Sequence, residues 1–262
     1  MTEGRVTRLS VVLGTDEAPL LVRWCTWAPP WQQWGHNDSY ALCTADGPLL
    51  IDPEAPAPET DDLLWRLAGA PPVATLLSTD WHERDAYVLR ERFGIPVWAP
   101  ATGVPDRGGG LEGEPDHLYD DAAVLPGGVR ALQIAGTGQA DHALSWLAPD
   151  GTRVLLTGDL LNGSADPHHP LAAALPRRHP GLYGGASRED LLQRDPDAIR
   201  RGLQRLRAEP CDVICGGHGV PVGGQDGILL DGHGGAHDAL TGLLSLYWAA
   251  RLAAGDDVVW AL

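Results

Sequence analysis

Three short polar segments of this chain hold histidines and carboxylates that could bind a metal ion, and each comes directly after an apolar run. They are Asp80-Trp81-His82-Glu83-Arg84-Asp85, Gly158-Asp159 and Gly217-His218-Gly219. Side chains at strand ends are held by a rigid backbone and face a shared crevice. Imidazole and carboxylate groups fixed in this way are what a zinc or iron site requires. The order of the segments therefore predicts a metal site.

The runs that must position these segments are apolar, rich in β-branched residues and bounded by turn signals, which is typical of strands. The expected strands are Arg5–Leu13, Leu20–Trp27, Ser39–Thr44, Pro48–Asp52, Val73–Thr79, Pro96–Ala99, Val129–Ala135, Ala143–Leu147, Arg153–Gly158 and Asp212–Cys215. Helical patterns fall between and after them. The expected helices are Glu59–Leu67, Glu83–Phe93, Asp197–Ala208 and His237–Ala253.

The order of these elements favours two mixed sheets covered by outer helices, because early strands come in pairs and later strands are separated by helices. With 262 residues, 44% of them hydrophobic, the chain can form one large domain over residues 1–262. Residues 162–190 are rich in Gly, Pro and polar residues, which predicts a lid loop. A C-terminal helix is expected at 236–254.

The composition limits the expected partners and location. The formal net charge of −16 repels a phosphate backbone, so no nucleic-acid partner is expected. Residues 1–10 lack the apolar core of a signal peptide, and no run approaches the roughly 20 apolar residues of a membrane helix. Four cysteines do not make a disulfide framework in a chain of this length. We expect a cytoplasmic protein with reduced thiols, either monomer or homodimer, and no membrane partner.

Taken together, the motifs resemble the metallo-β-lactamase superfamily over residues 36–222. Residues 36–42 and 47–53 look like its opening hairpin, which ends in an aspartate, and residues 77–85 stand at the place of its His-x-His-x-Asp-His motif. Thr157-Gly158-Asp159 looks like the segment that supplies a bridging aspartate, and Gly217-His218-Gly219 like the turn that supplies the last histidine. The resemblance implies a four-layer αββα sandwich, in which two mixed β-sheets are flanked by helices.

The chain departs from the family motif at several ligand positions. The first histidine position holds Asp80, the second keeps His82, the aspartate position holds Arg84 and the third histidine position holds Asp85. The usual Pro-Gly-His turn reads Gly136-Thr137-Gly138, with a histidine four residues on. One divalent ion therefore remains the expectation, zinc first and iron or manganese as alternatives, or no metal at all. The expected ligands are His82, Asp159, His218 and either Asp80 or Asp85, with His142 in reserve.

Arg84 has two open interpretations. A guanidinium stays protonated and cannot donate a lone pair, and a dication within about 4 Å would be repelled by several kcal/mol. Arg84 either turns away and pairs with Glu83, Asp85 or Asp52, or it replaces the second metal as a fixed positive charge.

Tryptophans are concentrated just before the family-like hairpin. Trp31 and Trp34 could wall an apolar substrate pocket with His36 near it, or they could form a hydrophobic plug or dimer contact. Trp81 stands between Asp80 and His82, so strand alternation would point it away from the site and into the core.

The resemblance implies a metal-assisted hydrolase that acts on an ester, lactone, thioester or phosphoester of a small, hydrophobic molecule. The ion would lower the pKa of its water, while a carboxylate such as Asp80 takes the proton and Arg84 and Asp159 complete the site. The alternative is a non-catalytic, metal-free member that binds a small molecule or a partner. One fold carries many chemistries, so both remain open.

Overall fold

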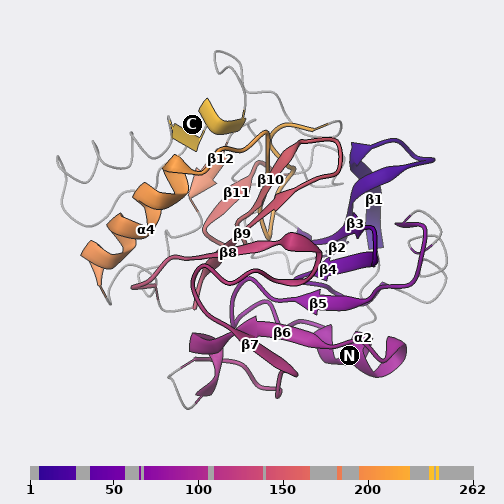
Figure 1. Ribbon diagram of the computed structural model, residues 1–262, viewed down its shortest axis with the longest axis horizontal. Coiled ribbons are helices and arrows are strands. Elements are labelled where there is room, and N and C mark those ends of the chain that lie inside the picture. The colour runs from indigo at the N-terminus through magenta and orange to yellow at the C-terminus, as the bar shows by residue number, and fades with distance from the viewer. Residues whose placement is uncertain are drawn as a thin grey trace.

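The computed structural model describes residues 6–27, 36–56, 65, 68–105, 109–137, 140–165, 182–184, 195–224, 236–238 and 240–241. Within these residues, two sheets of seven and four strands lie against one another, and a third sheet has two short strands (Figure 1). The first sheet comes from the N-terminal half of the chain and the second from the C-terminal half.

The seven-stranded sheet keeps its strands in chain order and is mixed. Pairing is antiparallel from β1 to β4 and parallel from β4 to β7. The strands are β1 (Val6–Gly14), β2 (Pro19–Trp27), β3 (His36–Thr44), β4 (Gly47–Ile51), β5 (Ala74–Leu76), β6 (Val97–Pro100) and β7 (His117–Tyr119).

The four-stranded sheet has the order β13-β10-β9-β8, and only its β10–β13 pair is parallel. Its strands are β8 (Arg130–Gln133), β9 (His142–Leu147), β10 (Arg153–Leu156) and β13 (Val213–Cys215). The small sheet pairs β11 (Leu161–Gly163) with β12 (Leu182–Gly184) in an antiparallel manner. Because β10 and β13 run parallel, the loops that carry Asp159 and His218 leave the sheet at the same end.

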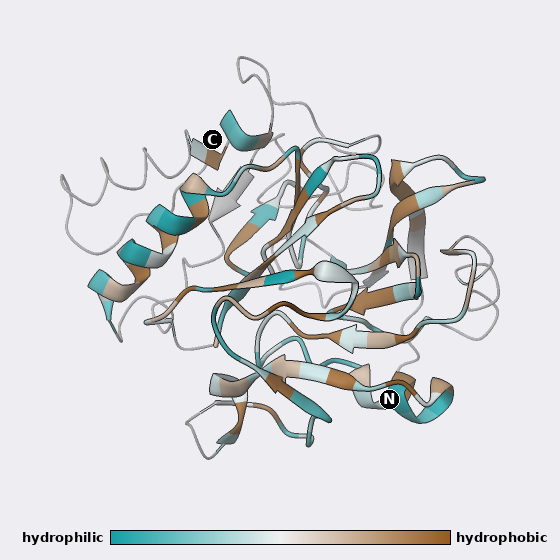
Figure 2. Cartoon of the chain, in the orientation of Figure 1, coloured by the Kyte–Doolittle hydropathy of each residue, from teal (hydrophilic) through white to brown (hydrophobic). Residues whose placement is uncertain are grey.

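Helices cover the outer face of each sheet. On the first sheet, Leu89 of α2 (Ala86–Phe93) packs with Val22, Trp24, Ala41 and Leu50. On the second, α4 (Pro196–Ala208) buries Ile199, Leu203 and Leu206 against strand residues and exposes its charged face (Figure 2). Two 3₁₀ turns, η1 (Ala101–Gly103) and η3 (Pro126–Gly128), lie in connections.

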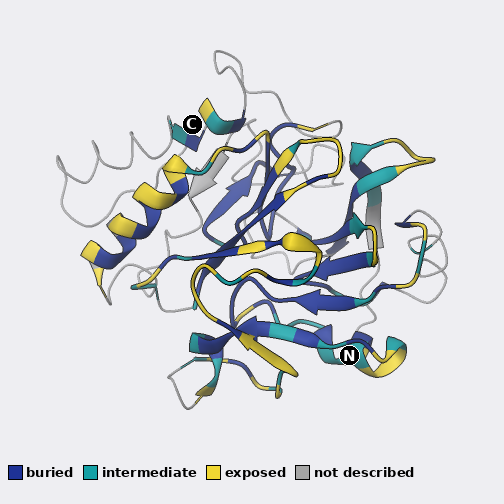
Figure 3. Ribbon diagram, in the orientation of Figure 1, coloured by how far each residue is buried: buried dark blue, intermediate teal, exposed yellow. Residues whose placement is uncertain are grey.

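The central core lies between the two sheets, where most strand residues are buried (Figure 3). Alternate side chains of a strand point to opposite faces of the sheet. Leu49 and Ile51 of β4 face this central core, whereas Leu50 faces α2. Strands buried on both faces read as continuous apolar runs, as these do. The layers are therefore helix, sheet, sheet and helix, which confirms the predicted αββα sandwich.

All ten predicted strands are present, with ends that differ by a few residues. β7, β11 and β12 are additional, and the last two fall in the predicted lid loop, which is therefore partly a small sheet. Of the expected helices, α2 begins at Ala86, later than predicted. Most of 59–67 and of the C-terminal helix lies outside the described residues. No described helix is long and apolar enough to span a membrane.

Candidate metal site

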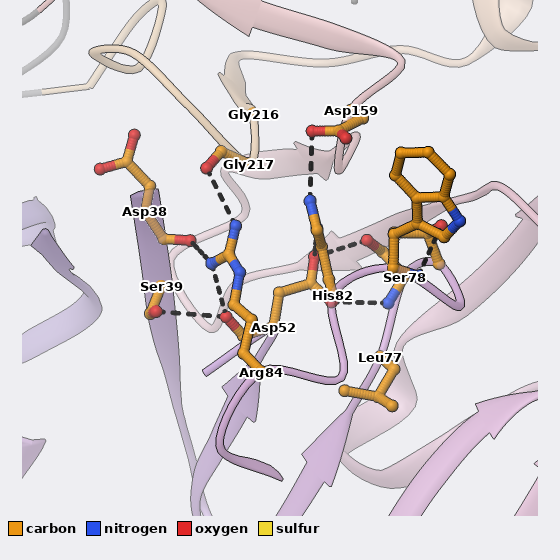
Figure 4. A network of polar contacts seen from close by, with 12 residues as sticks. Asp38, Ser39, Asp52, Leu77, Ser78, His82, Arg84, Asp159, Gly216 and Gly217 are labelled. Carbon is orange, nitrogen blue, oxygen red and sulfur yellow. Dashed lines mark hydrogen bonds and ion pairs between the residues drawn. The ribbon is translucent and has the colours of Figure 1, made fainter. Parts of the chain in front are cut away.

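Side chains from the ends of both sheets converge at one point. The Nε2 atoms of His82 and His218 lie 3.2 Å and 3.1 Å from Oδ1 of Asp159, and the ligand atoms of all three residues lie within 4.8 Å of one another (Figure 4). His82 follows β5, Asp159 follows β10 and His218 follows β13. The three residues are far apart in the chain, and the structure brings them together as the sequence predicted.

Asp52, at the end of β4, orients His82. Its Oδ2 lies 3.0 Å from Nδ1 of His82, so Nδ1 carries a proton and Nε2 is the ring nitrogen directed at Asp159. The carboxylate is itself held by Ser78, whose backbone N–H and hydroxyl donate to it at 2.7 Å and 2.5 Å. Asp52 and Ser78 are both buried. His82 is therefore rigidly aimed.

His218 and Asp159 are held by a shared partner, the buried side chain of Asn162. Its Oδ1 accepts the backbone N–H of His218 at 2.9 Å, and its Nδ2 donates to the carbonyl of Asp159 at 3.4 Å. The His218 ring bonds through Nδ1 to the carbonyl of His36 at 3.0 Å. As with His82, this leaves Nε2 of His218 directed at the carboxylate of Asp159.

The turn that carries His218 is fastened to β3. The backbone N–H of Asp38 donates to the carbonyl of Gly217 at 2.9 Å, and the hydroxyl of Tyr40 donates to the carbonyl of Gly216 at 2.8 Å. The guanidinium of Arg23 reaches the carbonyl of Gly219 at 3.4 Å. These contacts explain why a loop of the second sheet keeps a fixed position over the first.

A second group of potential ligands lies beneath this turn, but a cation already balances it. Ligand atoms of Cys25, His36 and Asp38 lie within 4.8 Å of one another, and all three residues are buried. Oδ1 of Asp38 pairs with Nη2 of Arg23 at 2.8 Å, and both side chains are fully buried. Burial favours the neutral carboxyl, but Arg23 and His36 hold the pKa of Asp38 below its usual value. We interpret this group as a structural ion pair.

Gly217 leaves room for the cluster because it has no side chain. A Cβ at this position would lie 2.4 Å from Cε1 of His82 and 3.3 Å from Oδ1 of Asp159. Gly158 has φ of +50°, and a Cβ there would lie 2.5 Å from the hydroxyl of Ser78. The glycines of the two segments are therefore needed for the close approach of the ligands.

The charges of the cluster are strongly coupled. Burial alone would lower the pKa of His82, but the carboxylates of Asp159 and Asp52 outweigh it and raise that pKa to about 9, with Arg84 opposing them. Burial also disfavours an ionised Asp159, yet His82 and His218 hold its pKa well below the usual range. Without an ion, the site is therefore a buried imidazolium–carboxylate pair.

The donor set suits a divalent ion. Two imidazoles and one carboxylate are the protein ligands of many zinc and non-haem iron sites that keep positions open for water or substrate. Oδ1 of Asp159 is buried and has no hydrogen bond of normal geometry among the described residues, although two imidazole nitrogens face it. Both imidazoles are oriented through Nδ1, as metal-bound histidines usually are.

Arg84 reaches into this site and pairs with backbone carbonyls. Its Nη1 donates to the carbonyls of Asp38 at 2.5 Å and Asp52 at 2.8 Å, and its Nη2 donates to that of Gly217 at 3.3 Å (Figure 4). The carboxylates that it could have paired with are engaged elsewhere. Glu83 accepts from the N–H groups of residues 112 and 113, and Asp85 from that of residue 55.

The structure does not bring Asp80, Asp85 or His142 into the cluster. Oδ2 of Asp80 accepts the N–H of Gly110 at 2.6 Å, and Asp85 holds the N–H of Ala55 at 2.9 Å. The ring of His142 bonds to the carbonyl of Ala140 at 2.8 Å and packs against Tyr119, and burial lowers its pKa. Each of these predicted ligands is turned away by a bond to its own surroundings.

The predicted pocket residues are only partly described. Trp31 and Trp34 lie outside the described residues. His36 is buried and contacts His218 through its backbone carbonyl. Trp81 was expected in the core, but 46% of its surface is exposed. β5 ends at Leu76, so residues 80–82 lie beyond the strand and strand alternation does not apply to them.

Several residues of the site were not singled out from the sequence. Asn162 lies in a segment predicted to be a loop, and nothing in the sequence marked it. Asp141 is buried beside the cluster, and burial raises its pKa to about 7, with the charges of Asp159 and Asp80 adding to the effect. Its neighbour His142 was the residue predicted from the sequence, but the His142 ring bonds to the carbonyl of Ala140.

No protein-family model and no curated protein sequence matches the chain. Among solved structures, TTHA1623 in a di-iron-bound form is 25% identical, with a TM-score of 0.51 over 74% of this chain and 91% of that one. A metallo-β-lactamase from Pontibacter korlensis is 16% identical, with a TM-score of 0.58 over 92% and 99%. The DIM-1 metallo-β-lactamase is 13% identical, with a TM-score of 0.58 over 94% and 99%. The chain is therefore a metallo-β-lactamase-fold protein, as its motifs predicted.

Proposed function

We propose that this protein is a metal-assisted hydrolase that holds one divalent ion through His82, Asp159 and His218. The observation that carries the proposal is the convergence of these three ligand atoms within 4.8 Å, each fixed by its own hydrogen bonds. Similar solved structures include a di-iron form and a class B3 di-zinc metallo-β-lactamase, which supports a metal at this site. The proposed substrate is an ester, lactone, thioester or phosphoester of a small molecule.

Each residue of the site would have its own role in the reaction. Asp52 and the carbonyl of His36 hold the two imidazoles through Nδ1, so that Nε2 of each ring is the atom that would bind the metal. A bound divalent ion would lower the pKa of a water molecule and would polarise a carbonyl or phosphoryl oxygen of the substrate. Arg84 would supply a fixed positive charge in place of a second metal ion.

Two buried carboxyl groups are candidates for accepting the proton from water. Asp80 was the predicted acceptor, and its carboxylate is bonded to the N–H of Gly110. Asp141 lies in electrostatic range of His82, Asp159 and Asp80, and its pKa near 7 suits proton transfer at neutral pH. Asp80→Asn and Asp141→Asn separate the two, because only the variant that lacks the acceptor should lose the rate while retaining the metal.

The test is a panel of chromogenic esters, lactones, thioesters and phosphoesters, assayed with added zinc, iron(II) or manganese and with chelator. We expect hydrolysis that chelator abolishes, metal restores and His82→Ala removes. His117→Ala is the matched control, because His117 is exposed on β7 and stacks on Trp98 with a centroid distance of 4.3 Å. Hydrolysis that persists in chelator would refute the proposal.

The alternative is a metal-free protein that binds a small molecule or a partner. It is favoured by the charge balance of the metal-free cluster, in which a protonated His82 pairs with Asp159. This alternative predicts no bound metal and no gain in thermal stability with zinc.

A further inference from the structure

Arg84 is fixed in one position by an unusual set of partners. Three backbone carbonyls, from β3, from the end of β4 and from the turn that carries His218, accept its Nη hydrogens. The backbone of Arg84 has φ of +42°, which is a strained conformation for a residue other than glycine. Residues held in such conformations occur mainly where the surrounding structure requires them, often at functional sites.

The charge of this guanidinium is not neutralised by its partners. Carbonyl groups satisfy N–H donors but carry no net charge, and no ion pair among the described residues includes Arg84. A guanidinium has five N–H groups, of which three are used by these carbonyls. The other two, on Nε and Nη2, make no bond within the described part of the chain.

The guanidinium also lies beside the proposed metal cluster. It shares Gly217 with that cluster, since a Cβ on Gly217 would touch His82 while its carbonyl accepts from Arg84. Figure 4 shows the Arg84 head group next to the His82 ring, on the side of Asp38 and Gly217. Arg84 is partly exposed, so part of its side chain is accessible from solvent.

We propose that Arg84 binds an anionic oxygen of the substrate beside the metal site, so that the preferred substrates carry a negative charge at or next to the bond that is broken. A phosphoester, or an ester with a neighbouring carboxylate, has this chemistry. Arg matches such groups because its planar N–H fork is complementary to two oxygens. The substrate class rests on the proposed hydrolase function, but anion binding by Arg84 does not.

The experiment is a calorimetric titration of the purified protein with inorganic phosphate, with metal content measured on the same samples. We expect phosphate binding that Arg84→Gln weakens at least tenfold while metal content stays the same. Arg84→Lys should fall between the two, because an ammonium keeps the charge but loses the fork. Arg90→Gln is the control, since the guanidinium of Arg90, on α2, donates to the carbonyl of Glu114 and not to any residue of the cluster. Circular dichroism and thermal melting identify any variant that fails to fold.

The outcomes separate the two proposals. If wild type binds no phosphate, or if folded Arg84→Gln binds it as tightly as wild type, Arg84 is not an anion site, whatever the metal content. If metal is absent from all samples but phosphate binding still depends on Arg84, the hydrolase proposal fails and the anion site stands. Equal losses in Arg84→Lys and Arg84→Gln, with both variants folded, would show that charge is not the cause and would also overturn the inference.

Discussion

At the scale of single residues, most of the candidate site consists of groups that orient other groups. Two imidazoles and a carboxylate face one point, and Asp52, Asn162 and a backbone carbonyl decide which atoms face it. Arg84 is aimed in the same way by three carbonyls. The chemistry of the site therefore depends on hydrogen bonds that no ligand motif records.

Replacing Asp52 tests this orientation directly. In Asp52→Asn, an amide replaces the carboxylate whose Oδ2 contacts both the His82 ring and the Ser78 hydroxyl. The His82 ring then loses the partner that fixes its proton on Nδ1. We expect zinc affinity, measured by chelator competition, to fall by about 10- to 100-fold. Asp116→Asn is the matched control, because Asp116 accepts a backbone N–H from Val97 away from the cluster. Unchanged affinity in Asp52→Asn would contradict the orienting role.

Asp141 gives the metal-free protein a pH-dependent stability. Its pKa is about 7 in the folded chain, above the usual carboxyl value, so the folded state binds more protons between about pH 4 and pH 7. The contribution of Asp141 to stability is therefore most favourable at the acidic end of this window and falls as the pH rises through it. Asp141→Asn removes the cost of burying a charge.

The corresponding measurement is thermal melting in chelator across this window. We expect Asp141→Asn to melt several degrees above wild type at pH 8, corresponding to an order of 1–3 kcal/mol, with the difference vanishing near pH 4. A variant that is less stable than wild type at pH 8 would show that the Asp141 carboxylate stabilises the fold.

At the scale of elements, the site is made by loops that leave four strands at one end of the two sheets. The parallel pair β10–β13 brings Asp159 and His218 together, and β3 holds the second of these loops through Asp38 and Tyr40. The loops can approach this closely only because glycines replace side chains at the contacts.

Gly217→Ala tests that close approach. The new methyl group would lie 2.4 Å from Cε1 of His82, so the ring or the turn must move. We expect at least a tenfold loss of zinc affinity, measured by chelator competition, with folding retained. Gly110→Ala is the control, because its nearest neighbour would be at an ordinary 3.4 Å. If both variants bind zinc like wild type, the described packing of the turn is wrong.

The sequence was informative about elements and less so about side-chain directions. Apolar runs located all ten predicted strands, because strands buried on both faces leave a continuous signal. β7, β11 and β12 have three residues each, too few for a periodic pattern. The turn after β5 could not be predicted in detail, so Trp81 was assigned to the core and Asp80 to the cluster. Their directions depend on local bonds, such as that of Asp80 with Gly110.

At the scale of the whole molecule, the cluster joins the two sheets. His82 follows a strand of the first sheet, whereas Asp159 and His218 follow strands of the second. An ion bound by all three would therefore resist separation of the layers. Binding to the folded state alone stabilises a protein by about 2.7 kcal/mol when the free ligand is at 100 times its Kd.

Thermal melting with and without zinc measures this effect. We expect saturating zinc to raise the Tm of wild type by about 5–10 °C, on the basis of roughly 2–4 °C per kcal/mol for a chain of this size. His142→Ala should keep the rise even if its own Tm is lower, because the His142 ring bonds elsewhere. The same rise in His82→Ala would place the zinc at another site.

The account depends most on a single ion held by His82, Asp159 and His218, and equilibrium dialysis against zinc, with metal counted per chain, measures that directly. We predict one equivalent in wild type and in His142→Ala, and none in His82→Ala or His218→Ala. Wild-type protein that binds no zinc, or that keeps its full equivalent after both histidines are replaced, would contradict the account.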